Sequence, residues 1–232
     1  VQADGRIDVA AIAGPPDQQG EVIVRLAAVD GRPALLGTGP LAAVDAPSER
    51  PPVVVDGTTF VQSQAQVLAF TAEGRPRWKT RPEEPVAHIC TACSLGVGDT
   101  YVTTDPTGLL VGYRSASAEP VWSRGFGTTV LGLETDGEVV VVAHAVEGDL
   151  AISAVDAGTG AILRSTAVPC GRGGAEAAPD GLVLRRVPQT AAVVVATAGY
   201  DRRVLCAARL EPQTGRVAWS LRQAGIAGVQ DH

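Results

Sequence analysis

The chain has 232 residues and a formal net charge of −6; 45% of its residues are hydrophobic and 4% are aromatic. This length allows one sizeable core, and all-β chains of this size commonly form a single domain. The acidic balance argues against a nucleic acid partner, which needs a basic stripe to displace counterions. No stretch approaches the apolar length of a spanning helix, so a membrane tether is expected only upstream of Val1.

Tight turns recur along the chain in front of strand-like segments. An Asp-Gly pair, once reversed to Gly-Asp, begins at Asp4, Asp56, Gly98, Asp136 and Asp180. Asp-Gly supplies the positive φ of a tight turn, and the β-branched run after it is typical of a strand. We therefore expect strands over residues 6–12, 58–62, 100–103, 138–144 and 182–187.

A second strand in each repeat leads into a Gly- or Pro-containing turn and then a large side chain, which we call the anchor. The second strands are expected over residues 22–29, 67–71, 109–114, 150–155 and 204–210. The anchors are Leu35, Trp78, Trp122, Arg164 and Trp219, and successive anchors are 43, 44, 42 and 55 residues apart. A period in the forties that is built of short strands is typical of β-propeller blades.

A weaker fourth strand precedes the next Asp-Gly pair, as at residues 52–55, 86–89 and 130–133. We predict an all-β fold, a single β-propeller domain over residues 1–232 with about five four-stranded antiparallel blades and essentially no helix. The repeats are placed near residues 4–50, 56–95, 98–133, 136–187 and 190–232. Two alternatives stay open: a sixth blade in which residues 1–12 pair with 224–230, and an outer strand of the fourth blade at 182–187 after a loop at 169–179.

Two repeats carry a longer signature. Residues 152–160 spell ISAVDAGTG, and residues 211–219 spell EPQTGRVAW. This resembles the A-x-D-x-x-T-G-x-x-x-W repeat of quinoprotein-type propellers, called PQQ-like or tryptophan-docking repeats. The resemblance implies that Trp78, Trp122 and Trp219 are structural, each packed between blades on a turn of its neighbour, as suits a large flat side chain. Arg164 holds the tryptophan position of its repeat, where a guanidinium can stack in place of an indole.

Enzymes of the resembled family bind pyrroloquinoline quinone and calcium in an eight-bladed ring, with a vicinal disulfide and a catalytic aspartate. This chain has no Cys-Cys pair and no asparagine for the metal, and it is shorter than such a ring. We therefore expect no catalytic residues, no cofactor and no metal site. Non-enzymatic relatives, such as envelope assembly lipoproteins and the outer domains of membrane receptor kinases, are the closer analogy.

The four cysteines are Cys90, Cys93, Cys170 and Cys206. Two structural disulfides in an exported protein are the favoured interpretation, with Cys90–Cys93 clipping a loop and Cys170–Cys206 joining neighbouring strands. Four cysteines permit three connectivities, and free buried thiols are an alternative. A metal site at His88, Cys90 and Cys93 lacks a fourth ligand, and a redox pair lacks the helix N-terminus that lowers a thiol pKa.

The candidate recognition residues lie in loops between strands, because propellers bind at the loop-rich ends of the central channel. The candidates are Asp105, Glu147, Asp149 and Arg172. The sequence contains no Gly-x-Ser-x-Gly motif of a serine nucleophile, and His88 and His144 are each expected to be a packed or an edge histidine.

These observations favour a non-enzymatic extracytoplasmic domain that is secreted, periplasmic or at the cell surface. It would serve as a binding, scaffold or sensor domain of an envelope or membrane-anchored receptor protein, with a protein or a small envelope ligand as partner. The alternative is a quinoprotein oxidoreductase or cofactor carrier that uses the central channel. An enzyme should gather His, Asp or Glu side chains at one channel mouth.

Overall fold

The structure is a computed structural model, which describes residues 7–13, 20–29, 32–40, 52–62, 66–72, 74–80, 93–104, 109–127, 130–146, 149–169, 182–198 and 204–224. In the first three of these ranges only the course of the strands is described. The described residues form five antiparallel sheets, and none of them lies in a helix. The predicted all-β class is confirmed.

Each sheet is made of strands that are consecutive in the sequence, in the order in which they pair. We call the sheets blades one to five in chain order. Blade one contains β1 (Ile7–Ala13), β2 (Gly20–Val29) and β3 (Arg32–Pro40), and blade two contains β4 (Val53–Val55), β5 (Thr58–Gln62), β6 (Val67–Phe70) and β7 (Pro76–Lys79). Blade three contains β8 (Ser94–Val97), β9 (Thr100–Thr104), β10 (Leu110–Tyr113) and β11 (Trp122–Arg124). Blade four contains β12 (Val130–Thr135), β13 (Val139–Val146), β14 (Asp149–Asp156) and β15 (Ile162–Ala167). Blade five contains β16 (Leu182–Arg186), β17 (Val193–Ala198), β18 (Val204–Glu211) and β19 (Arg216–Ala224).

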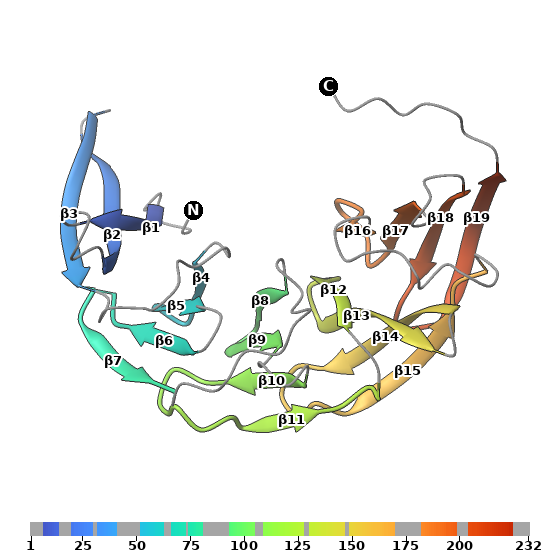
Figure 1. Cartoon of the computed structure of the whole chain (residues 1–232), viewed down its shortest axis with the longest axis horizontal. Helices are drawn as coiled ribbons and strands as arrows, with labels where there is room; N and C mark the ends of the chain where they lie inside the picture. The colour runs from blue at the N-terminus through green and yellow to red at the C-terminus, as the bar shows by residue number, and fades with distance from the viewer. Residues whose placement is uncertain are drawn as a thin grey trace.

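The blades follow one another along an arc (Figure 1). The first strands of the four-stranded blades, β4, β8, β12 and β16, lie on the concave side, and the last strands, β7, β11, β15 and β19, lie on the convex side. We call these the inner and outer strands. Blades one and five stand at the two ends of the arc. The alternative sixth blade would pair residues 1–12 with 224–230, of which residues 1–6 and 225–230 lie outside the described residues; β1 pairs with β2.

The Asp-Gly turns join the first two strands of a blade rather than opening it. Asp56 and Gly57 have φ of 45° and 67°, and they connect β4 to β5 so that Val53 faces Phe60. A two-residue turn makes a hairpin, so the strand before it pairs with the strand after it. The strands predicted at 52–55 and 130–133 are therefore inner strands of the following blade. Likewise residues 182–186 form the inner strand of blade five, not an outer strand of blade four.

Apolar side chains of adjacent blades pack face to face and form the core. The largest cluster joins blades four and five, where Val141 and Ile152 of one sheet meet Leu184, Val195 and Leu210 of the next. Each of these side chains is nearly or fully buried, and burial of such a side chain contributes about 1.5–3 kcal/mol. The scarcity of aromatic residues is offset by β-branched and leucine side chains, which suit tightly packed sheets.

A buried polar side chain links blades two and three. The Gln62 amide nitrogen donates to the carbonyl oxygen of Thr104 at 2.8 Å, and its oxygen accepts from the hydroxyls of Tyr101, at 3.3 Å, and Thr103. Beside it the rings of Phe60 and Tyr101 stack with centroids 4.5 Å apart and planes 5° apart. A satisfied buried network of this kind fixes the orientation of one sheet on the next.

Candidate functional site

The turn before each outer strand is built by local hydrogen bonds from the signature residues. In blade four the carboxylate of Asp156 accepts from the backbone N–H of Thr159 at 2.8 Å and from its hydroxyl at 2.6 Å. The backbone N–H of Gly160 donates to the Asp156 carbonyl oxygen at 2.9 Å. The hydrogen bonds from Thr159 lower the pKa of Asp156, because they stabilise its charged form. The turn is therefore fixed by its own sequence.

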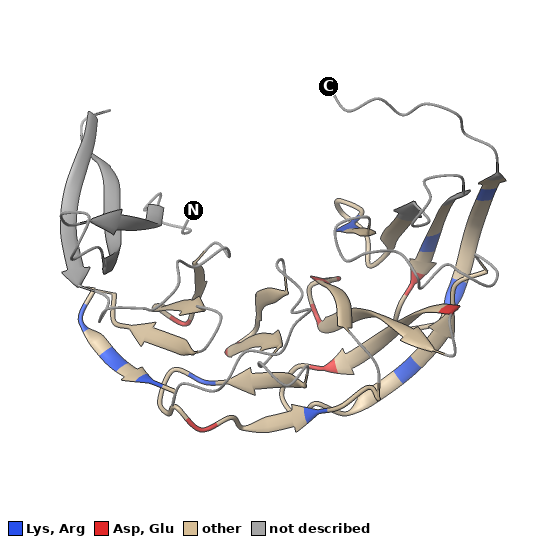
Figure 2. Cartoon of the chain, viewed as in Figure 1, with Lys and Arg blue, Asp and Glu red and all other residues tan. Residues whose placement is uncertain are grey.

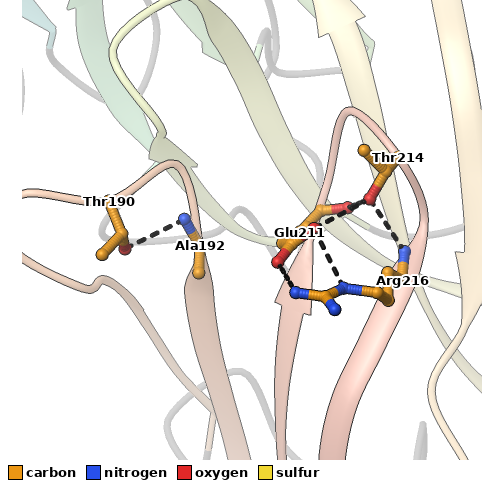
Figure 3. Close-up of polar contacts among 5 residues, drawn as sticks. All are labelled: Thr190, Ala192, Glu211, Thr214 and Arg216. Atoms are coloured by element: carbon orange, nitrogen blue, oxygen red, sulfur yellow. Dashed lines mark hydrogen bonds and ion pairs between the residues drawn. The ribbon is translucent and has the colours of Figure 1, made fainter.

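Blade five builds the same turn with glutamate in place of aspartate (Figure 3). The hydroxyl of Thr214 donates to a carboxylate oxygen of Glu211 at 3.2 Å, and the backbone N–H of Arg216 donates to that hydroxyl at 3.2 Å. The guanidinium of Arg216 also bonds both carboxylate oxygens of Glu211. This pairing lowers the pKa of Glu211 and raises the pKa of Arg216.

In blades two, four and five one extra residue stands in the outer strand directly before the anchor. The register shifts by one residue at Arg77, Leu163 and Ala218, each a β-bulge. In blade three Val121 donates to the carbonyl oxygen of Gly112 while Trp122 is the residue that faces Gly112. A bulge re-aims the next side chain, which here turns the anchor toward the following blade.

Trp122 is seated between two glycines. It is 8% exposed, and its indole N–H donates to the carbonyl oxygen of Ala157 in the blade-four turn at 2.8 Å. A Cβ atom on Gly160 of that turn would lie 2.6 Å from the indole of Trp122. A Cβ atom on Gly112, in the same blade as Trp122, would lie 2.3 Å from the indole. Only glycine allows this approach, and Gly160 also has φ of 69°. The predicted wedge between blades is present at this junction.

Trp78 makes the same contact one blade earlier. Its indole N–H donates to the carbonyl oxygen of Ser115, in the turn of blade three, at 2.9 Å. Ser115 and Ala157 both stand seven residues before the anchor of their own blade. The ring of Trp78 is half-buried and also meets Phe60 edge-on, with centroids 5.7 Å apart. The interaction is therefore a repeated device of the chain.

Arg164 occupies the anchor position between blades four and five. A Cβ atom on Gly215 would lie 2.6 Å from Cδ of Arg164 and 2.8 Å from the hydroxyl of Thr166. Gly215 takes the place in the blade-five turn that Gly160 takes in blade four, with φ of 72°. The arginine stem therefore lies on the turn glycine, although the side chain as a whole is exposed.

Trp219 differs from the other two tryptophans. The repeat predicts that it is buried between blades, and the structure leaves 45% of it exposed. It faces Arg209 across the bulge in β19. No blade follows β19 in the part of the chain that the structure describes, so this anchor has no following turn there.

Two of the four cysteines can be placed. Cys93 and Cys206 are both buried and both disulfide-bonded, and the described residues contain no free cysteine. They belong to different core clusters. Cys90 and Cys170 lie outside the described residues, so the predicted pairing stays a prediction.

His144 is held in a chain of hydroxyls that crosses blade four. It is 4% exposed, with Nε2 2.8 Å from the hydroxyl of Ser153, which donates to the hydroxyl of Ser165 at 3.1 Å. Its ring meets Phe126, in the segment between blades three and four, with centroids 4.6 Å apart. Burial lowers the pKa of His144, because it penalises the charged ring. The histidine is packed, as predicted, but the sequence does not predict its serine partners.

The family of the chain follows from these docked turns and from comparison with known proteins. A family model described as outer membrane protein assembly factor BamB matches residues 17–230. The chain belongs to this PQQ-like β-propeller family. No curated protein is similar enough in sequence to count as a match.

Solved structures of PQQ-like propellers show the same fold at low identity. BamB from Moraxella catarrhalis is 18% identical with a TM-score of 0.59, over 93% of this chain and 65% of that one. Quinohemoprotein alcohol dehydrogenase from Comamonas testosteroni is 18% identical with a TM-score of 0.55, over 78% and 35%. A europium-containing methanol dehydrogenase is 12% identical with a TM-score of 0.62, over 92% and 49%. The chain thus spans less than two thirds of each of these PQQ-like proteins.

The loop residues predicted for recognition are placed only in part. Asp149 begins β14, faces Val146 across the hairpin and is half-buried; Asp105, Glu147 and Arg172 lie outside the described residues. Among the described residues, no three His, Cys, Asp or Glu side chains are grouped so that they could hold a metal ion. No helix long and apolar enough to cross a membrane occurs in the same part of this PQQ-like chain.

Proposed function

We propose that this PQQ-like propeller is a non-enzymatic binding or scaffold domain that recognises a protein partner. The supporting observation is a set of large apolar side chains that remain 45–56% exposed in the outer strand of blade four or directly before the outer strand of blade three: Val121, Ile162 and Leu163. Single exposed apolar residues are ordinary, but a series along one face is typical of an interaction surface.

The proposed location is extracytoplasmic, in the envelope, on the cell surface or in secreted form. Two buried cysteines are disulfide-bonded, and disulfides persist mainly in oxidising compartments. The matching family is described as an outer membrane assembly factor. Together these points support the outer domain of an envelope or membrane-anchored protein. A sensor role with a small envelope ligand belongs to the same proposal, with the channel-end loops as its site.

The alternative function is a quinoprotein oxidoreductase or cofactor carrier, favoured by the likeness to methanol dehydrogenase and alcohol dehydrogenase. Such a cofactor needs convergent polar groups and a hard-cation site with six or more oxygen ligands. The described acidic and polar side chains do not fit it: Asp136 accepts backbone N–H groups of its own turn, and Gln62 joins two blades. We therefore derive no reaction step through a quinone.

The test is titration of the purified chain with pyrroloquinoline quinone and calcium, followed by absorbance and thermal unfolding. We expect no saturable change and no dye-linked oxidation of alcohols or sugars. A ligand at a hundredfold excess over its dissociation constant stabilises the folded state by about 2.7 kcal/mol. Stabilisation of that size, accompanied by turnover, would replace the scaffold proposal with the enzyme.

A further inference from the structure

The outer strands of the described blades carry charge of only one sign. None of the strands β7, β11, β15 and β19 contains aspartate or glutamate. Their charged residues are all basic: Arg77, Lys79, Arg124, Arg164, Arg216 and Arg222. Figure 2 shows the blue segments distributed along the convex side of the arc. This pattern stands out in a chain whose formal net charge is −6.

Several of these cations are left facing solvent. Arg216 is paired with Glu211, and Nε of Arg124 donates to the carbonyl oxygen of Gly160. Arg77, Lys79 and Arg222, by contrast, are exposed. Of the acidic side chains in the turns before these strands, Asp156 and Glu211 are engaged by hydrogen bonds, whereas Glu119 is exposed. Arg77, Lys79 and Arg222 therefore present positive charge that no acidic side chain among the described residues pairs with.

Apolar side chains lie among these cations. Val121 and Leu163 directly precede the anchors of two adjacent blades and are 46% and 56% exposed. Ile162 is 45% exposed beside Leu163, and Leu221 is 50% exposed in β19. Leu163 belongs to a blade with a described neighbour on each side, so its exposure does not depend on which blade follows β19.

The bulges limit how a partner can bind. An unpaired outer strand invites a further strand, and a bulge is a common way to prevent such pairing. Blades two, four and five have their register shift in the outer strand, directly before the anchor. Recognition on this side must then use side chains, through apolar contacts and charge, rather than a continuous ladder of backbone hydrogen bonds.

We propose that the convex face formed by the outer strands β7, β11, β15 and β19 binds an acidic segment of a partner protein that also carries apolar side chains. The apolar groups would cover Val121 and Leu163. The carboxylates would pair with the exposed cations Arg77, Lys79 and Arg222. This inference rests on the proposed function and names the chemistry of the partner. A flexible segment can follow the curve of the arc in Figure 1, whereas a flat bilayer would touch only part of it.

The experiment uses the 232-residue chain and a fluorescein-labelled peptide of twelve residues that alternates leucine and glutamate. We expect saturable binding by fluorescence anisotropy that weakens as salt is raised, because exposed charges are screened. Leu163→Ser should weaken binding by about tenfold, since a central apolar contact contributes above 1 kcal/mol. The matched control is Val183→Ser, which removes a similarly exposed side chain, 52%, from inner strand β16 and should leave binding unchanged.

Two control peptides separate the contributions of charge and apolar contact. Replacing glutamate by lysine should abolish binding, and replacing leucine by serine should weaken it. The inference is overturned if the leucine–glutamate peptide does not bind, if Leu163→Ser and Val183→Ser have equal effects, or if the lysine peptide binds as well.

Two other occupants would also overturn it. One is a second copy of the chain, seen as self-association in sedimentation that Leu163→Ser removes; the other is a bilayer, seen as binding to phosphatidylserine vesicles that the acidic peptide does not compete. Quinone turnover would defeat the scaffold function itself. Failure of the peptide without quinone turnover defeats only this inference.

Discussion

The indole of Trp122 donates its hydrogen bond to Ala157 of the next blade while its ring lies on Gly160 of the same turn. The contact joins two features of the repeat, Trp122 and Ala157, that are 35 residues apart in the chain. Directly before the tryptophan, Val121 donates to the carbonyl oxygen of Gly112, and the Asp156 turn presents both the carbonyl oxygen and the glycine that Trp122 contacts. The tryptophan side chain and the turn together thus fix how blade three packs on blade four.

Replacing each tryptophan by alanine should give unequal losses of stability. Trp122→Ala should cost about 3–5 kcal/mol, because a buried aromatic side chain leaves a rigid cavity. Trp78→Ala should cost less, since that ring is half-buried, and Trp219→Ala should cost under about 1 kcal/mol. Denaturant unfolding of the three variants measures the order. Equal losses, or the largest loss at Trp219, would show that docking does not control stability here.

Gly160→Ala should destabilise the chain more than Gly57→Ala. Both glycines have positive φ, 69° and 67°, so both substitutions strain the backbone by about 1 kcal/mol. Only the Gly160 Cβ would meet the Trp122 ring, whereas a Cβ on Gly57 meets nothing within 4 Å. The two variants should differ by about 1–3 kcal/mol in their loss of unfolding free energy, and this difference measures the clash between the added Cβ and the Trp122 ring. A difference near zero would mean that the ring can move away.

The repeat in the sequence predicts the strands, the anchors and the role of Trp122, because glycine turns and large side chains at a fixed spacing are typical of stacked blades. The same repeat misplaces the inner strand. Periodicity alone assigns residues 52–55 to the preceding repeat, since it does not say where a blade begins. The hairpin geometry of Asp56 and Gly57 decides this.

Features that depend on long-range register could not be predicted. Ser153 and Ser165 pair across neighbouring strands, and His144 reaches Ser153 diagonally. The spacing of these residues in the sequence does not predict that alignment. Trp219 follows the Thr-Gly pair of the repeat signature and Trp122 does not, yet Trp219 is exposed and Trp122 is buried. The local sequence specifies the wedge, but the neighbouring blade determines its burial.

Arg164→Trp should stabilise the chain. The position precedes the Gly215 turn just as Trp122 precedes the Gly160 turn, and the arginine stem already lies on Gly215. An indole would bury more apolar surface there, and such repeat-restoring substitutions commonly add about 0.5–2 kcal/mol. Leu163→Trp is the matched control, because the bulge residue points to solvent. The denaturant midpoints of Arg164→Trp and Leu163→Trp compare the stability of the two variants. A loss of stability in Arg164→Trp would mean that the junction between blades four and five is shaped to hold arginine.

The cysteines should be fully oxidised in the exported protein. Intact mass without reductant should be lower than that of the reduced chain by four hydrogens, as two disulfides require. Reduction should lower the free energy of unfolding, with about 2–4 kcal/mol typical for one bridge. Peptide mapping would then test the Cys90–Cys93 and Cys170–Cys206 pairs. Four alkylatable thiols in native protein would contradict the extracytoplasmic proposal.

Stability should fall in mild acid because of His144. Burial lowers its pKa in the folded state below the ordinary value of 6.5, so the unfolded chain takes up a proton first as pH decreases. The contribution of the neutral ring is complete above about pH 6.5 and is lost progressively below it, down to the folded-state pKa. His144→Gln should remove this part of the pH dependence. The carboxyls of Asp156 and Glu211, whose pKa values are lowered, act in a separate and more acidic range. Unfolding free energies between about pH 7.5 and 5 for both proteins measure the effect; identical slopes would mean that His144 titrates as it does in solvent.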